Sequence, residues 1–148
     1  MYKYKNILLP TDFSLGSEEA FEHAKDIAKS MGAKIHLLNV IHPVVYPTGL
    51  DLAHESLINL EDNLEKASKA NLEKVAKRLK DLGIESKSTI LMGKPSDQIM
   101  EYSKKFDIDL VVIATHGSSG LERFIFGSTT EKVIRKVECP VLVVHFNK

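Results

Sequence analysis

The segment 114–128 has the residue types and spacing of an anion-binding loop. It reads Ala-Thr-His-Gly-Ser-Ser-Gly-Leu-Glu-Arg-Phe-Ile-Phe-Gly-Ser. Gly117 and Gly120 allow the backbone to turn and to approach a ligand closely. Ser128 and Glu131 have the spacing of a capping box, which predicts that a helix begins there with free N–H groups. Helix N-termini of this kind attract phosphate.

A purely structural interpretation of this segment remains open. Ser128 would cap a helix with or without a ligand, and glycines are common in the loops of α/β proteins. The standard nucleotide motifs are missing: Gly93-Lys94 is followed by Pro95 without the preceding glycine of a Walker motif, and G-x-G-x-x-G does not occur. A phosphate loop in this chain would therefore be of another type.

The composition indicates a compact protein without a nucleic-acid or membrane signature. The 148 residues carry 20 acidic and 20 basic side chains, so the net charge is zero. This balance gives no reason to expect nucleic acid or an acidic membrane surface as a partner. The single cysteine, Cys139, excludes an intrachain disulfide and fits a reducing compartment. The first apolar run is too short for a signal peptide or a membrane span, so we expect a cytoplasmic protein with one domain over residues 1–148.

The hydrophobic pattern predicts five strands that alternate with four helices. Runs of apolar and β-branched residues predict strands at 7–10, 34–41, 84–92, 109–114 and 140–146. Apolar residues at helical spacing predict helices through 20–31, 57–82, 95–106 and 128–138. Such alternation is typical of the α/β class with a doubly wound parallel sheet and helices on both faces.

The composition of the strands predicts the order 3-2-1-4-5. The third strand contains Glu-Ser-Lys-Ser-Thr and suits an edge, whereas the first and fourth are apolar enough for the centre. Ligands of such sheets lie at the carboxyl ends of the strands, where the order reverses. That point places Pro10-Thr11-Asp12 opposite Thr115-His116-Gly117.

Asp12 and His116 are the titratable residues of this predicted site. Asp12 is interpreted either as a turn carboxylate bonded to nearby N–H groups or as a ligand for a ribose hydroxyl, a base N–H or magnesium. His116 is either satisfied by backbone or in contact with a ligand. The six histidines show no metal-ligand spacing, and no nucleophile elbow or acid/base pair is visible. We therefore expect no catalytic residues.

The chain resembles the nucleotide-binding universal stress proteins over nearly its whole length. The resemblance lies in Lys-Asn-Ile-Leu-Leu-Pro-Thr-Asp at 5–12, Leu-Leu-Asn-Val-Ile at 37–41, Gly-Lys-Pro at 93–95 and Pro-Val-Leu-Val-Val at 140–144. The motif of that family is G-x-x-G, nine residues, then G-[S/T]. This chain matches it except that Ala114 stands at the first glycine. We expect the additional methyl group to lower the affinity rather than to remove the site.

The resemblance implies a binding site for ATP, or for ADP or AMP, with Mg²⁺ or Mn²⁺ held through the phosphates. It implies that Pro10, Thr11 and Asp12 line the nucleoside end and that the backbone of Val40 meets the adenine edge. The phosphate end would be formed by Ala114, Thr115, His116, Gly117, Ser118, Ser119, Gly120, Gly127, Ser128, Thr129 and Thr130. The family is regulatory, and its members bind nucleotides and hydrolyse them slowly or not at all.

Three classes of function follow from these observations. The leading hypothesis is an ATP-binding stress-response protein whose nucleotide state, through the loop 118–126, biases binding to a protein partner not identified by the sequence. The second is a slow ATP hydrolase or nucleotidyl-transferring enzyme, and the third is a nucleotide-free dimerisation or chaperone-like module. The strand 140–146 is apolar and predicted at a sheet edge, so we expect a homodimer through this strand.

Overall fold

Five parallel strands form one sheet in the order β3-β2-β1-β4-β5, as predicted. The computed structural model describes residues 1–43, 54–115 and 127–146. Its strands are β1 (Asn6–Pro10), β2 (Lys34–Ile41), β3 (Ser86–Met92), β4 (Leu110–Ala114) and β5 (Val141–Val144). β3 carries the most exposed residues of the described strands and lies at an edge, which confirms the interpretation of its polar sequence.

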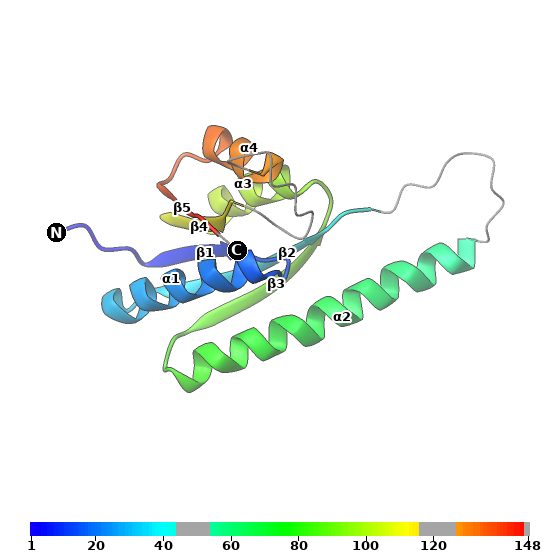
Figure 1. The fold of residues 1–148 in the computed structure, drawn as a ribbon, viewed down its shortest axis with the longest axis horizontal. Helices are drawn as coiled ribbons and strands as arrows, with labels where there is room; N and C mark the ends of the chain where they lie inside the picture. The colour runs from blue at the N-terminus through cyan, green and yellow to red at the C-terminus, as the bar shows by residue number, and fades with distance from the viewer. Residues whose placement is uncertain (44–53, 116–126, 147–148) are drawn as a thin grey trace.

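Two helices cover each face of the sheet (Figure 1). α1 (Leu15–Met31) and α2 (His54–Asp81) pack on one face, and α3 (Pro95–Lys105) and α4 (Ser128–Lys136) pack together on the other. The N-terminal half of α2 continues beyond the ends of the strands (Figure 1). The fold is therefore the predicted doubly wound α/β arrangement. No helix in the described ranges is long and apolar enough to cross a membrane.

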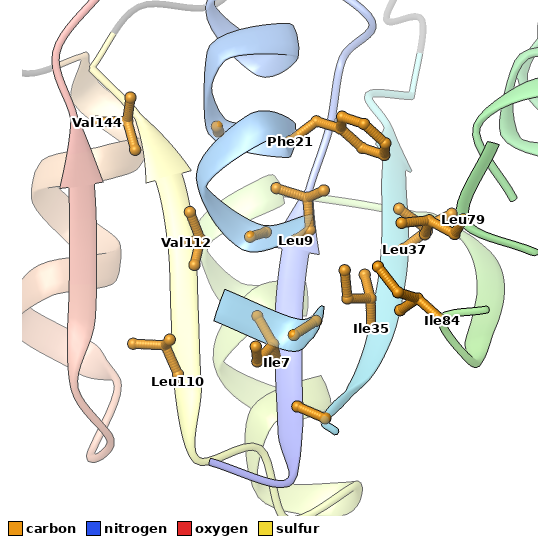
Figure 2. Close-up of a cluster of buried hydrophobic side chains, with 14 of the residues drawn as sticks. Ile7, Leu9, Phe21, Ile35, Leu37, Leu79, Ile84, Leu110, Val112 and Val144 are labelled. Carbon is orange, nitrogen blue, oxygen red and sulfur yellow. The ribbon is translucent and has the colours of Figure 1, made fainter. Parts of the chain in front are cut away.

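The larger core lies between the sheet and α1 with α2. Alternate residues of the strands point to this face, and Figure 2 shows Ile7 and Leu9 of β1 beside Ile35 and Leu37 of β2. All four side chains are at most 1% exposed. Burial of a side chain of this size contributes about 1.5–3 kcal/mol to the stability of the fold. The central strands therefore give the loops at their carboxyl ends a rigid support.

The smaller core lies on the face of α3 and α4. Leu8 and Leu38 supply it from the central strands, and Ile99 and Val133 supply it from the helices. Lys136 of α4 also forms an ion pair with Asp97 of α3 at 2.6 Å. This packing holds α3 and α4 together on this face of the sheet.

Candidate functional site

A cavity of about 340 Å³ opens at the carboxyl ends of the central strands. It lies at the position where the strand order reverses, between β1 and β4. Its described lining consists of Pro10, Thr11, Asp12, Ser17, Leu38, Val40, His42, Pro95, Ile99, Ile113, Ala114, Thr115, Gly127, Ser128, Thr129 and Thr130. A volume of this size lies in the range of small-molecule sites.

The turn after β1 forms one wall of the cavity. The Ser17 hydroxyl donates to Asp12 Oδ1 at 2.8 Å, and the Ser14 N–H donates to the same oxygen at 3.0 Å. Ser14 is the N-cap of α1, where its hydroxyl accepts from the Ser17 N–H. Asp12 is thus the turn carboxylate considered in the sequence analysis, and these bonds also fix its position at the rim of the cavity.

The start of α4 forms the opposite wall. The N-cap of this helix is Gly127 and not Ser128, and no side chain caps it. The capping-box interpretation of Ser128 was therefore wrong, because the helix begins one residue earlier than a Ser128 cap requires. As a consequence, the first turn of α4 presents the backbone N–H groups of 128–130 without a side-chain acceptor from the described residues.

Thr115 and Thr130 connect this helix start to the sheet. The Thr115 carbonyl accepts from the Gly127 N–H at 2.6 Å, and the Thr130 hydroxyl donates to the Ala114 carbonyl at 2.7 Å. Thr115 is 1% exposed and Thr130 is 3% exposed, so both bonds are protected from water. They hold the N-terminus of α4 in a fixed place above the end of β4.

The electrostatic character of the cavity favours an anion bound by backbone. Among the described lining residues there is no lysine or arginine, and Asp12 is the carboxylate. An anion here would rely on the N–H groups and the dipole of α4, which carries partial positive charge at its N-terminus. Asp12 would repel a phosphate, so a hydroxyl group or a metal ion suits the Asp12 wall better.

The described part of the predicted site comes together around this cavity. Pro10, Thr11, Asp12, Val40, Ala114, Thr115, Gly127, Ser128, Thr129 and Thr130 all line it. The predicted residues His116, Gly117, Ser118, Ser119 and Gly120 lie outside the described residues, as does the loop 118–126.

Sequence analysis missed several residues that also line the cavity. Ser17, Leu38, His42, Pro95, Ile99 and Ile113 belong to this group. His42 and Pro95 follow the ends of β2 and β3, so the rule that ligands lie at the carboxyl ends of parallel strands could have identified them. Leu38, Ile99 and Ile113 form the apolar wall of the cavity and look like ordinary core residues in the sequence.

The comparison with protein families agrees with this architecture. The model of the "Universal stress protein family" matches residues 3–145. The chain belongs to the universal stress protein family. Universal stress protein MJ0531 of Methanocaldococcus jannaschii is 38% identical over 141 residues, which cover 95% of this chain and 82% of that protein.

Solved structures of universal stress proteins have the same fold. The structure of MJ0577 from M. jannaschii, a test case for the structure-based assignment of biochemical function, has a TM-score of 0.86 and 32% identity. The match covers 99% of both chains. A universal stress protein in complex with cAMP has a TM-score of 0.73 and 23% identity, with 97% of this chain and 98% of that chain covered. This last likeness concerns the fold alone.

Proposed function

We propose that this universal stress protein binds an adenine nucleotide in the cavity between β1 and α4. The observation that carries the proposal is the first turn of α4, which lines a cavity at the switch point of the sheet and whose N–H groups are capped by no side chain of the described residues. A universal stress protein of this fold was solved in complex with cAMP, so an adenine nucleotide is the ligand class that we propose for the cavity of this chain.

The two walls of the cavity suit the two ends of a nucleotide. The proposed phosphate end is formed by Thr115 to Gly120 and by Gly127 to Thr130, and the proposed nucleoside end by Pro10 to Asp12 with Val40. The apolar wall can contact a base, and the Asp12 carboxylate can accept from a ribose hydroxyl. A Mg²⁺ or Mn²⁺ ion would be held mainly by the phosphates, since Asp12 is the single carboxylate among the described lining residues.

The biological role that we propose is regulatory. The nucleotide state would bias binding to a protein partner through the loop 118–126, in a cytoplasmic homodimer. The half-buried Cys139 thiol is compatible with a reducing compartment. An enzymatic role is less favoured, because the described lining residues include no lysine or arginine that could stabilise a transition state.

Two measurements test the binding proposal. Heat denaturation of the purified protein followed by anion-exchange chromatography identifies any co-purified ATP, ADP or AMP. Titration calorimetry with Mg-ATP, Mg-ADP and AMP, after removal of bound nucleotide, then gives the affinities. We expect saturable binding of at least one of these ligands. Absence of both co-purified nucleotide and saturable binding at millimolar ligand would refute the proposal and favour the nucleotide-free module.

Ala114→Gly is the matched variant for this experiment, because it restores the first glycine of the family motif. Ala114 lies at the end of β4 and lines the cavity. If the phosphates lie over this position, removal of the methyl group should raise the affinity for Mg-ATP. If Ala114→Gly instead lowers both the affinity for Mg-ATP and the melting temperature, the methyl group of Ala114 stabilises β4 and does not restrict the ligand.

A further inference from the structure

The hydrogen-bond ladder between β1 and β2 stops abruptly beside the cavity. The Thr11 N–H still donates to the Leu38 carbonyl at 2.9 Å, as the ladder requires. Residues of a central parallel strand bond alternately to its two neighbours. Leu38 and Val40 therefore face β1, whereas the Ile41 carbonyl faces β3, where it accepts from the Gly93 N–H at 3.0 Å.

Two side chains replace the next two bonds of this ladder. In a continued ladder the Val40 N–H would donate to the Thr11 carbonyl, and the Phe13 N–H would donate to the Val40 carbonyl. Instead, the Asn39 side chain donates to the Thr11 carbonyl at 2.8 Å. The Phe13 N–H donates to the Thr11 hydroxyl at 3.0 Å. In the described part of the chain, no hydrogen bond joins Val40 to Thr11 or Phe13.

The consequence is an open peptide edge at the cavity. The N–H and the carbonyl of Val40 face the gap that β1 has left, and Val40 lines the cavity. A donor and an acceptor side by side on one strand match adenine, whose N1 accepts and whose 6-amino group donates. Guanine has the opposite order at these positions, because its N1 donates and its O6 accepts.

Asn39 is held in place from the other side of the sheet. Its Oδ1 accepts from the hydroxyl of Ser68 on α2 at 2.7 Å, so the carboxamide bridges α2 and the turn after β1. Asn39 is 9% exposed and Ser68 is 5% exposed. Buried polar groups of this kind are costly unless they are bonded, and here both ends of the carboxamide are used. Asn39 does not line the cavity in the described structure, so its effect on a ligand would act through Thr11 and Val40.

We propose that the Asn39 carboxamide and the Thr11 hydroxyl are positioning groups that keep the Val40 peptide edge free for base recognition. They satisfy the Thr11 carbonyl and the Phe13 N–H, which would otherwise pair with Val40 and close the site. The Phe13 backbone has a φ of 64°, a conformation unfavourable for a non-glycine residue, so the turn needs such support. This inference rests on the proposed nucleotide binding and identifies residues that set the preference for adenine.

The test compares Asn39→Ala and Thr11→Val with two matched controls. Thr11→Ser keeps the hydroxyl group at position 11. Ser103→Ala removes a buried hydroxyl on α3, which donates to the Met100 carbonyl at 2.7 Å and lies away from the turn. Calorimetry and competition give the Kd of Mg-ATP and of Mg-GTP for each protein, and thermal melting monitors the fold.

We expect wild type to prefer Mg-ATP. In the two test variants the ratio of the Kd of Mg-GTP to the Kd of Mg-ATP should fall by about three- to tenfold, the usual contribution of one hydrogen bond. Thr11→Ser and Ser103→Ala should keep the wild-type ratio. A wild type that binds no nucleotide would refute the proposed function itself. Two results would overturn the positioning role and leave the binding function intact. One is a wild type that binds Mg-ATP and Mg-GTP equally well. The other is a pair of test variants in which the two Kd values change by the same factor or do not change.

Discussion

Gly127 lies so close to Thr115 that position 127 has no room for a side chain. A Cβ atom there would stand 2.8 Å from the Thr115 carbonyl oxygen, which is the acceptor of the Gly127 N–H. The φ of Gly127 is −58°, so the requirement for glycine comes from this contact and not from its backbone conformation.

Gly127→Ala should therefore displace the start of α4, and Gly127→Val should displace it further. We expect a stability loss of about 1–3 kcal/mol, typical of overpacking, and a much larger loss of Mg-ATP affinity because the N–H groups of 128–130 move. Calorimetry and urea unfolding measure the two effects. Unchanged affinity in Gly127→Val would contradict the assignment of the phosphate end.

The hydroxyl groups of Ser128 and Thr130 should differ sharply in their effect on stability. Ser128 does not cap α4, so Ser128→Ala should change the free energy of unfolding by no more than about 0.5 kcal/mol. Thr130→Val removes the buried bond to the Ala114 carbonyl and should cost about 1–3 kcal/mol. Thr130→Ser, which keeps the hydroxyl, is the control. If Ser128→Ala lowers the free energy of unfolding as much as Thr130→Val does, the Ser128 hydroxyl caps α4 after all.

The strand order could be predicted from the sequence, whereas the roles of Ser128 and Thr130 at the start of α4 could not. The apolar strands and the polar β3 were sufficient to predict the strand order, and hence the meeting of Thr11 with Thr115. The N-cap at Gly127 could not be predicted, because it depends on the Thr115 carbonyl that lies twelve residues earlier in the chain. The Asn39 bridge was missed for the same reason: its partners lie on β1 and α2.

The end of the last strand was also set by a distant contact. The sequence predicted a strand to residue 146, but β5 ends at Val144, and the Phe146 N–H donates to the Thr115 hydroxyl at 3.3 Å. Side-chain acceptors of this kind are invisible to periodicity, which registers the alternation of polar and apolar residues and not their long-range partners.

ATP turnover should be very slow. Asp12 is held by Ser14 and Ser17, and the described lining residues include no lysine or arginine to stabilise a transition state. A phosphate-release assay at saturating Mg-ATP should give less than about one event per second, the lower end of ordinary enzymes. Faster turnover that disappears in both Asp12→Ala and His116→Ala would instead support the enzyme hypothesis.

His36 should make the stability of the protein depend on pH. It is 4% exposed and lies at 2.8 Å from the Tyr102 hydroxyl through Nδ1. Burial, with the charges of Lys34 and Lys87, lowers the pKa of His36 from its ordinary 6.5 to about 4. The unfolded state therefore binds one more proton between these values, and stability falls as the pH falls through this window.

Urea unfolding at pH 7 and pH 5 should show a loss of about 2 kcal/mol from this one group. His36→Gln, which keeps a donor and an acceptor but does not titrate, should show a smaller loss. Arg78 lowers the pKa of Glu18, and Lys136 lowers that of Asp97, so these carboxyl groups affect stability mainly at still lower pH. An identical loss in wild type and His36→Gln would contradict the role of His36.

The outer side of β5 has a row of backbone groups that no other strand in the described ranges pairs with. The Pro140 and Val144 carbonyls accept from the N–H groups of Val111 and Thr115, each at 3.0 Å, so the even-numbered residues of this segment face β4. The N–H and carbonyl groups of Val141 and Val143 consequently face away from the sheet, and no described strand lies beside them. Edges of this kind pair with other strands, and a two-fold axis would join β5 to its own copy.

Val143→Pro tests this dimer directly, because proline removes the outward N–H group and leaves the bonds from β5 to β4 in place. We expect light scattering of the wild type to give about twice the 16.5 kDa chain mass at micromolar concentration. The Val143→Pro protein should shift toward monomer, with its circular dichroism spectrum retained. Val143→Thr keeps both the N–H group and the β-branched shape, so it should remain dimeric. A 16.5 kDa wild-type monomer would refute edge pairing, and a Val143→Pro dimer of unchanged affinity would place the interface elsewhere.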